Sequence, residues 1–459
     1  MNSRPSPGQA PPLTALAQTW AAIERINQQR QTAVPDFFEA VRDLVIVASS
    51  SRGGSSIFTE ILRQSPQLLH CKGEITPLLT LAGLSYPASG SGSDHLSAED
   101  AGPHNQARLA ALAHQMALDV GANIAVDLGD GPLRQRFVWD LAWRLAVQWP
   151  EVELDADFLA EAIGQTMAQL TRQHRWPAGA FLDPSLFHLL LIGRLRRRYP
   201  SLNPYSYDCD PELIRRLCPE ARVSAAPPSR LVIEEPPFVM ISPGHPLTVE
   251  ALATRPLIIK TPSNVYRLEF LRRLFPQARM RILHLTRHPA ASINGLVDGW
   301  LYHGFFSHPL PGRLAIAGYS DRFPDWGQRW WKYDLPPGWQ EWTARPLPEV
   351  CGFQWRAAHQ ATLDFIEHQP LDSLRVRFED VIGTPACRRR CFGEIAAWLG
   401  VDAEPLLTAS AGDLPPVMAT CPPRRRRWFA NAAMLRPVLN DPAILEMAAR
   451  LGYEAHDES

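Results

Sequence analysis

Two short stretches of the chain place an arginine where a phosphate could be bound. Residues 48–58 read ASSSRGGSSIF, in which Arg52 is followed by two glycines and two serines. The glycines let the backbone turn closely around an anion, and the N–H groups at the start of a following helix can bind it. In RILHLTRHPAASINGL, Arg287 follows a predicted strand. Together the two arginines predict a ligand with two separated phosphates.

Each stretch has a simpler interpretation when it is taken alone. Residues 52–56 could be a turn before an N-capped helix, and Arg287 could be a surface arginine. No lysine follows the glycines, so the stretch differs from the G-x-x-x-x-G-K-[ST] loop of nucleotide-hydrolysing enzymes. The occurrence of an arginine after each of two predicted strands favours phosphate binding, because ligands of open α/β sheets collect outside the carboxyl ends of the strands.

The elements around both arginines alternate between strands and helices. The run LVIVA before Arg52 predicts a buried strand, and SSIFTEILRQSP predicts a helix that ends at a proline. From Pro256 onward, PLIIK, RMRILHLT and SLRVRFEDV predict strands with helices between them. This alternation predicts an α/β fold with three layers, α/β/α, around a mainly parallel central sheet.

The middle of the chain has a different pattern. Several segments between residues 105 and 200 carry apolar residues at i, i+3 and i+4, which predicts helices, and PSRLVIEEPPFVMISPGHP predicts a short strand broken by prolines. We therefore expect residues 43–84 and 255–459 to form the α/β core and residues 85–254 to form a mostly helical insertion that covers or shapes a pocket. Residues 1–42 are expected to be an N-terminal extension with a disordered start and then a helix.

Composition limits the possible functions. A formal net charge of −1 over 459 residues argues against an overall nucleic-acid binder. No apolar run approaches the ~18–20 residues that a membrane helix needs. The seven cysteines show no metal-type pairs, so reduced thiols, a cytoplasmic location and no bound metal are expected. The oligomeric state leaves no signal in the sequence.

Four motifs in order resemble those of PAPS-dependent sulfotransferases, with a P-loop-like fold, of bacterial type and with some features of the tyrosylprotein branch. SSSRGGSSIFTEIL resembles the 5′-phosphosulfate loop, and LIIKTPSNVYRLEFLRRLFPQARMRILHLTRHP resembles the segment that ends at the 3′-phosphate arginine. SLRVRFEDVIGTP resembles a late family element, while RRRRWFANAAML and ARLGY resemble the C-terminal cofactor loop and helix. The resemblance covers about 43–84 and 255–453.

This resemblance implies transfer of the sulfuryl group from PAPS to a hydroxyl of a small-molecule or metabolite acceptor, with PAP as product. The residues that match cofactor-binding positions are Arg52, Gly53, Gly54, Ser55, Ser56, Arg287, Arg427 and Trp428. The chain departs from the family at Gly53, where the motif has a serine, and at Gly295, where the family has a 3′-phosphate-binding serine. Ser292 or Asn294 could supply the missing hydrogen bond.

The resemblance also implies the catalytic groups. Glu74, in LLHCKGEITPLL, matches the base of the tyrosylprotein branch, and Lys260, in LIIKTP, matches a lysine that supports the developing charge. Glu74 could instead cap the next helix, and Lys260 could be an exposed strand end. His70 is a rival base, because cytosolic members use histidine, and His303 and His308 are weaker candidates.

Two other functions remain open from the sequence. One is an ATP- or GTP-dependent phosphotransferase, against which the missing loop lysine counts. The other is a non-catalytic binding protein on the same fold, which Gly295 makes conceivable. The five tryptophans of WGQRWWKYDLPPGWQEW are expected to be mainly core beneath a long loop, or otherwise an aromatic wall for the acceptor.

Overall fold

The computed structural model describes residues 13–422, 424 and 426–453. The predicted disordered start, residues 1–11, lies outside the described residues. At the centre is a six-stranded sheet with the strand order β3-β2-β4-β1-β5-β8. The strands are β1 (Asp43–Ala48), β2 (Leu69–Cys71), β3 (Val120–Gly121), β4 (Leu257–Lys260), β5 (Arg279–Thr286) and β8 (Asp372–Arg377).

Neighbouring strands of this sheet are parallel, except that β3 pairs antiparallel with β2. Strand β1 lies between β4 and β5, with Leu44 opposite both Leu257 and Met280. Its run of apolar residues is buried from Leu44 onward, as expected of a strand covered on both faces. The predicted mainly parallel sheet is therefore confirmed.

Helices cover both faces of the sheet. Alternate residues of β1 face opposite sides, so Val45 and Val47 pack in one core while Leu44 and Ile46 pack in another. The first face is covered by α3 (Ser55–Leu62), α15 (Pro385–Leu399) and α16 (Glu404–Ala411). The second is covered by α2 (Phe37–Ala40), α4 (Thr76–Leu81), α5 (Gln106–Asp119), α11 (Leu268–Leu274) and α13 (Leu347–His368). The fold is the predicted three-layer α/β/α arrangement.

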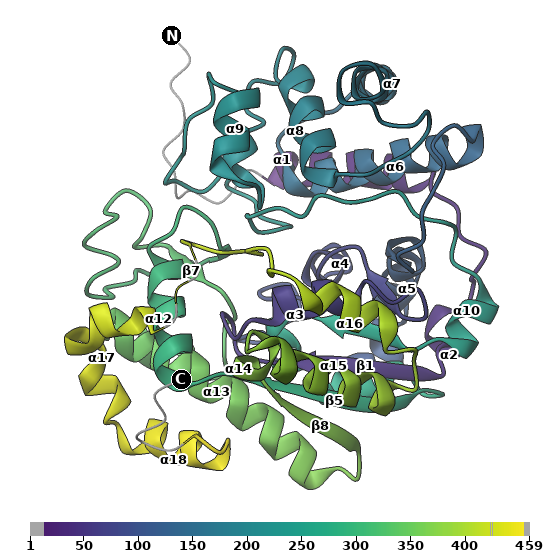
Figure 1. Ribbon diagram of the computed structural model, residues 1–459. Coiled ribbons are helices and arrows are strands. Elements are labelled where there is room, and N and C mark those ends of the chain that lie inside the picture. The colour runs from purple at the N-terminus through teal and green to yellow at the C-terminus, as the bar shows by residue number, and fades with distance from the viewer. Residues whose placement is uncertain (1–12, 423, 425, 454–459) are drawn as a thin grey trace.

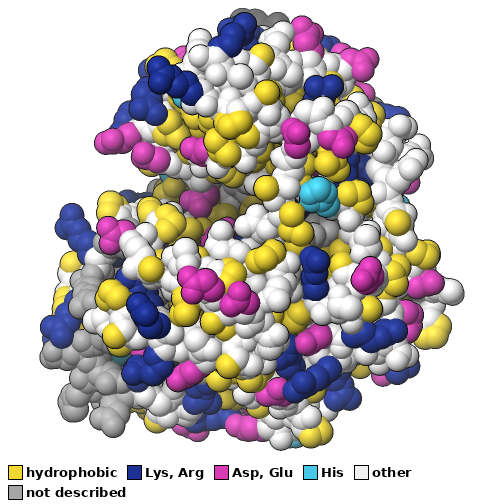
Figure 2. All heavy atoms as spheres, turned by 45° about the vertical axis from the view of Figure 1, so that its right-hand side comes forward, with side chains coloured by type: hydrophobic (Ala, Val, Ile, Leu, Met, Phe, Trp, Pro, Cys, Tyr) yellow, Lys and Arg dark blue, Asp and Glu magenta, His cyan; other side chains and the backbone are white. Residues whose placement is uncertain are grey.

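A group of helices stands apart from the sheet, at the top of Figure 1. It contains α1 (Leu13–Asn27), α6 (Gly131–Gln148), α7 (Ala156–His174), α8 (Pro184–Leu195) and α9 (Pro211–Leu217), and we call it the helical unit. The unit has its own apolar core, built around residues such as Phe137, Leu159 and Phe187. Figure 2 shows a recess between this unit and the α/β part of the molecule.

A long irregular segment leads from α9 to α10 (Val249–Thr254) and back to the sheet. The sequence predicts a short strand here, and that prediction is wrong. The segment makes one isolated bridge, between Tyr207 and Phe238, and no strand. Its many prolines explain the difference, since proline has no N–H to donate to a ladder.

The aromatic stretch beside α12 (Pro289–Trp300) is mainly core. Strands β6 (Phe306–Pro309) and β7 (Trp330–Lys332) form a two-stranded sheet there. The buried tryptophans are Trp326, Trp330, Trp331 and Trp339. The C-terminal helices α17 (Ala432–Leu439) and α18 (Pro442–Arg450) pack against α13. Within the described part of the chain no helix has the length and apolar character to cross a membrane.

Candidate active site

The loop between β1 and α3 has a conformation that its small residues make possible. Arg52 and Gly54 have positive φ angles of 61° and 94°. A Cβ on Gly54 would lie 2.1 Å from the Phe378 ring, so only glycine fits there. Gly54 precedes α3 without any side-chain cap, which leaves the first N–H groups of the helix available to an anion.

Arg52 and Arg287 lie in direct contact. An Nη1 of Arg287 donates a hydrogen bond to the backbone carbonyl of Arg52 over 3.0 Å. The Arg287 guanidinium lies over the Phe378 ring, with Cζ 4.8 Å from its centroid. Burial lowers the pKa of Arg287 to about 10, and the carboxylate of Glu379 opposes this, so the guanidinium stays charged at neutral pH. The structure therefore brings the two predicted phosphate-binding arginines together.

The Arg52 side chain reaches toward the C-terminal part of the chain. Its Nη1 donates to the carbonyl of Met418 over 2.5 Å, and its guanidinium lies over the Phe305 ring. Arg427, in the 3₁₀ helix Arg427–Asn431, hydrogen-bonds to Asp298 of α12. The segment that leads to Arg427 thus lies against the arginine of the first loop.

Hydrogen bonds from Lys260 connect Glu74 with Ser56 at the carboxyl edge of the sheet. The Lys260 ammonium is 2.5 Å from Oε1 of Glu74 and 3.3 Å from Oγ of Ser56. Glu74 follows β2, Lys260 ends β4, and Ser56 lies in the first turn of α3. Because these strands are parallel, their carboxyl ends converge on one edge. The predicted base and lysine are thereby linked to the predicted phosphate loop.

Helix α12 carries the three candidates for the missing 3′-phosphate contact. The Asn294 side chain is engaged, because its amide nitrogen donates to Asp298 and its oxygen accepts from Asn431. Ser292 is fully buried, and its hydroxyl has no hydrogen-bond partner among the described residues. A Cβ on Gly295 would lie 3.4 Å from Cβ of Arg52. Ser292 is thus the candidate with a free hydroxyl.

Trp428 lies beside the strand end of β5. Its ring stacks on that of His288, with centroids 6.0 Å apart and planes inclined by 17°. His288 directly follows Arg287, so Trp428 lies near the second arginine.

The rival histidines have other surroundings. His70 lies inside β2, and burial lowers its pKa well below the ordinary value, so the ring is neutral within the sheet. His308 is buried in β6, 3.5 Å from Oδ2 of Asp94. His303 lies against the Tyr302 ring. Within the part of the chain that the structure describes, none of the three forms a hydrogen bond or ion pair with Glu74, Lys260 or Ser56.

Glu379 is a site residue that the sequence reasoning missed. Its carboxylate accepts a hydrogen bond from the His288 backbone N–H over 2.9 Å and another from the Tyr453 hydroxyl over 2.9 Å. It thereby holds the chain just after Arg287. The RFED stretch that contains Glu379 was a visible signal, but nothing in it indicated a partner.

Asp334 was missed as well, and no local signal could have found it. Ser51, next to Arg52, donates to one oxygen of Asp334 over 2.5 Å, and the Tyr266 hydroxyl donates to the other over 2.8 Å. Burial raises the pKa of Asp334 to about 6, although both hydrogen bonds oppose this rise. The first loop is thus tied to the aromatic region.

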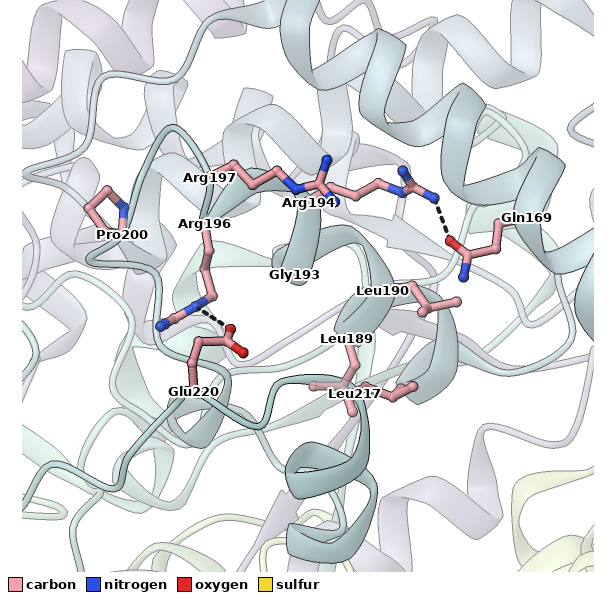
Figure 3. A pocket seen from close by; sticks show the side chains of 10 residues that line it. All are labelled: Gln169, Leu189, Leu190, Gly193, Arg194, Arg196, Arg197, Pro200, Leu217 and Glu220. Carbon is pink, nitrogen blue, oxygen red and sulfur yellow. Dashed lines mark hydrogen bonds and ion pairs between the residues drawn. The ribbon is translucent and has the colours of Figure 1, made fainter.

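A large cavity lies elsewhere, in the helical unit. It measures about 610 Å³ and is bordered by Arg194, Arg196 and Glu220, among others (Figure 3). Arg196 pairs with Glu220 over 3.5 Å, and Arg194 donates to Gln169. No residue around this cavity belongs to the loops at the sheet edge, so it is separate from the candidate active site.

No protein-family model matches the chain, and no curated protein matches it. The sulfotransferase domain from the curacin biosynthetic pathway has a TM-score of 0.34 and 13% identity, covering 90% of this chain and 99% of that domain. The sulfotransferase STF9 from Mycobacterium avium has a TM-score of 0.36 and 13% identity, covering 99% of this chain and 88% of that protein. Both similar structures are sulfotransferases, but both TM-scores lie below 0.5, so a proposal for the reaction has to rest on this chain's own residues.

Proposed function

We propose that the protein transfers the sulfuryl group of PAPS to a hydroxyl group of a small-molecule acceptor and releases PAP. One observation carries the proposal. Arg52 and Arg287 are in contact at the carboxyl edge of the sheet, where Lys260 also bonds both Glu74 and Ser56 of the first turn of α3. A pair of cations next to a carboxylate and a lysine suits a bisphosphorylated donor and a hydroxyl acceptor.

The residues present fit such a donor. The uncapped start of α3 and the close backbone turn at Gly54 suit the phosphosulfate end. Arg287 and the partnerless hydroxyl of Ser292 would hold the 3′-phosphate, and Arg427 lies close enough to Arg287 for its positive charge to lower the pKa of Arg287. The Trp428 ring provides a flat apolar surface for the adenine.

Glu74 and Lys260 would carry the chemistry. PAPS supplies the sulfuryl group on its 5′-phosphate. Glu74 would accept the proton of the acceptor hydroxyl, and general base catalysis of this kind contributes a factor of about 10²–10⁴ to the rate. Lys260 lies between Glu74 and Ser56, so its ammonium can stabilise negative charge on the phosphate side while holding Glu74 in place. The remaining task is positioning, as in other in-line transfers.

Thermal stability with two nucleotides separates this proposal from a phosphotransferase. We expect PAP without metal to raise the Tm strongly, and ATP with Mg²⁺ to raise it little, because at equal concentration the ligand that binds the folded state more tightly stabilises it more. Stronger stabilisation by ATP with Mg²⁺ would contradict the proposal.

Incubation with PAPS and a metabolite extract then tests catalysis. We expect products that have gained the mass of a sulfate group, together with PAP. PAP binding without any sulfated product would favour the non-catalytic binding protein instead.

A further inference from the structure

Glu235 is a carboxylate beside the active site that the proposed chemistry does not use. It lies half-buried in the irregular segment between α9 and α10. The preceding residue, Glu234, binds Arg144 over 2.7 Å and Gln148 over 2.8 Å. Glu235 instead accepts a hydrogen bond from the Ser307 hydroxyl in β6. The two neighbouring glutamates therefore have different surroundings.

Arg144 of α6 lies against the residue before Glu235 and the residue before Glu74. Besides its bond to the residue before Glu235, its Nη2 donates to Asp119 over 2.7 Å. A Cβ on Gly73 would lie 2.9 Å from Nη1 of Arg144, so the residue before Glu74 lies against the same guanidinium. The residue before Glu74 and the residue before Glu235 thus both lie against Arg144.

A second connection leads from Glu235 to Arg52. The Phe305 backbone N–H donates to the carbonyl of Pro236, the residue after Glu235. The Phe305 ring in turn lies under the Arg52 guanidinium, with Cζ 5.3 Å from its centroid. The segment that contains Glu235 therefore borders both the loop of the predicted base and the predicted donor loop.

The charges around Glu235 leave it without a counter-ion. Glu74 pairs with Lys260, and Asp94 pairs with Arg267 over 2.9 Å. Within residues 13–422, 424 and 426–453, no basic side chain forms an ion pair with Glu235. The charged or titratable groups that influence it are Glu74, Asp94, His308 and Lys332. Burial, with a further contribution from Glu74, raises the pKa of Glu235 to about 7. A partly buried carboxylate that no basic side chain contacts is costly, and a bound cation would lower that cost.

We propose that Glu235 binds an ammonium group that the acceptor carries near the hydroxyl to be sulfated. The acceptor class would then be amino alcohols, amino sugars included. The inference rests on the proposed sulfotransferase function, because it places the ammonium group next to Glu74. Glu235 is a binding group here and takes no part in proton transfer.

The experiment compares a metabolite extract with the same extract after N-acetylation, which removes the charge of amines but leaves hydroxyls in place. Wild-type protein and PAPS should give sulfated products that contain a basic nitrogen, and these should disappear from the acetylated extract. With the acceptor so identified, Glu235→Gln should raise its KM about 10- to 100-fold and change kcat little, as expected for loss of a hydrogen-bonded charge pair. Glu250→Gln, an exposed glutamate on α10, is the matched control.

Each other outcome has a definite meaning. Sulfated products that persist in the acetylated extract, or an unchanged KM in Glu235→Gln, would overturn this inference and leave the proposed function intact. A loss in kcat at constant KM would also overturn it, since that would assign Glu235 to proton transfer. Absence of any sulfated product with the wild-type protein would remove the proposed function and the inference together. A normal Tm shift with PAP shows that the Glu235→Gln protein is folded.

Discussion

The donor end and the acceptor end of the proposed site are built differently. At the donor end, Arg52 and Arg287 each follow a central strand, and one contacts the backbone of the other. At the acceptor end, Glu74 and Glu235 lie in loops whose neighbouring residues contact Arg144 of the helical unit. Parallel strand pairing therefore positions the first pair, whereas buried ion pairs from a distant helix position the second.

The two ends of the proposed site can therefore change independently of each other. The donor end depends on the register of β1 and β5, which the whole core maintains. The acceptor end depends on a few charged contacts with α6, so substitutions in the helical unit should alter acceptor use before they alter donor binding. The following variants test that separation.

The largest effect is expected for Glu74→Gln. Loss of the base should lower kcat about 10²- to 10⁴-fold, while PAP binding should stay the same, because the variant removes no donor contact. Single-turnover transfer and calorimetric PAP titration measure the two quantities. Full turnover at saturating acceptor would show that Glu74 is not the base.

Arg144→Met should lower the free energy of unfolding by removing the ion pairs at the acceptor end. Arg144 is buried and pairs with Asp119 and Glu234, so its removal leaves two buried carboxylates without their cation. Breaking a buried ion pair in this way costs about 3–5 kcal/mol of the free energy of unfolding. Urea denaturation measures the loss, and Arg25→Met, whose partner Glu153 is exposed, is the control. A loss below about 1 kcal/mol would show that the ion network does not hold this region.

Arg287→Ala should weaken nucleotide binding at the donor end. The variant removes a charged partner of the 3′-phosphate, and a hydrogen bond to a charged group contributes about 1.5–3 kcal/mol. The Kd for PAP should therefore rise about 10- to 100-fold, while the Kd for adenosine 5′-phosphosulfate, which has no 3′-phosphate, should change much less. Equal weakening of both ligands would place Arg287 elsewhere on the nucleotide.

The pH dependence of acceptor binding is a further test of the acceptor end. The Glu235 carboxyl has a pKa of about 7, raised by burial, and only its ionised form pairs with an ammonium group. Its ionised fraction rises about tenfold between one unit below and one unit above that pKa. The acceptor KM should therefore fall by about that factor as the pH rises across this window. In Glu235→Gln the KM should be flat over the same window, and the Kd for PAP should not follow the wild-type acceptor curve.

The sequence predicted the donor end better than the acceptor end for a physical reason. Strands β1, β4 and β5 were visible because buried parallel strands are mainly apolar runs. The edge strand β8 was visible because apolar and polar residues alternate in its sequence. Arg287 directly follows β5, and Arg52 follows β1 after three serines, so a local pattern was enough to predict that the two arginines lie together. The short strands β2 and β3, of three and two residues, carry no such pattern and were not predicted.

Residues with distant partners could not be predicted. Asp334 meets Ser51 across 283 residues of sequence, and Arg144 meets Glu234 across 90. The sequence predicted a short strand for the segment that contains Glu235. That prediction assigned Glu235 no part in binding or catalysis. Long-range side-chain contacts depend on the assembled fold, and a single sequence gives no direct measure of them.

The smallest effect is expected for Gly295→Ser, which tests the donor end alone. A Cβ at this position would meet Cβ of Arg52 at 3.4 Å, an ordinary contact distance, and replacing a glycine inside a helix favours the folded state. The new hydroxyl would lie beside Arg52, so the Kd for PAP should fall a few-fold, as calorimetry can measure.

A double-mutant cycle then shows which hydroxyl serves the 3′-phosphate. If Ser292 supplies the contact in the native chain, Ser292→Ala should weaken PAP binding more in the wild-type background than in the Gly295→Ser background, because two hydroxyls can then replace one another. Equal losses in both backgrounds would mean that the two positions act independently. Weaker PAP binding in Gly295→Ser itself would show that the glycine is required for the close approach of α12 to the first loop.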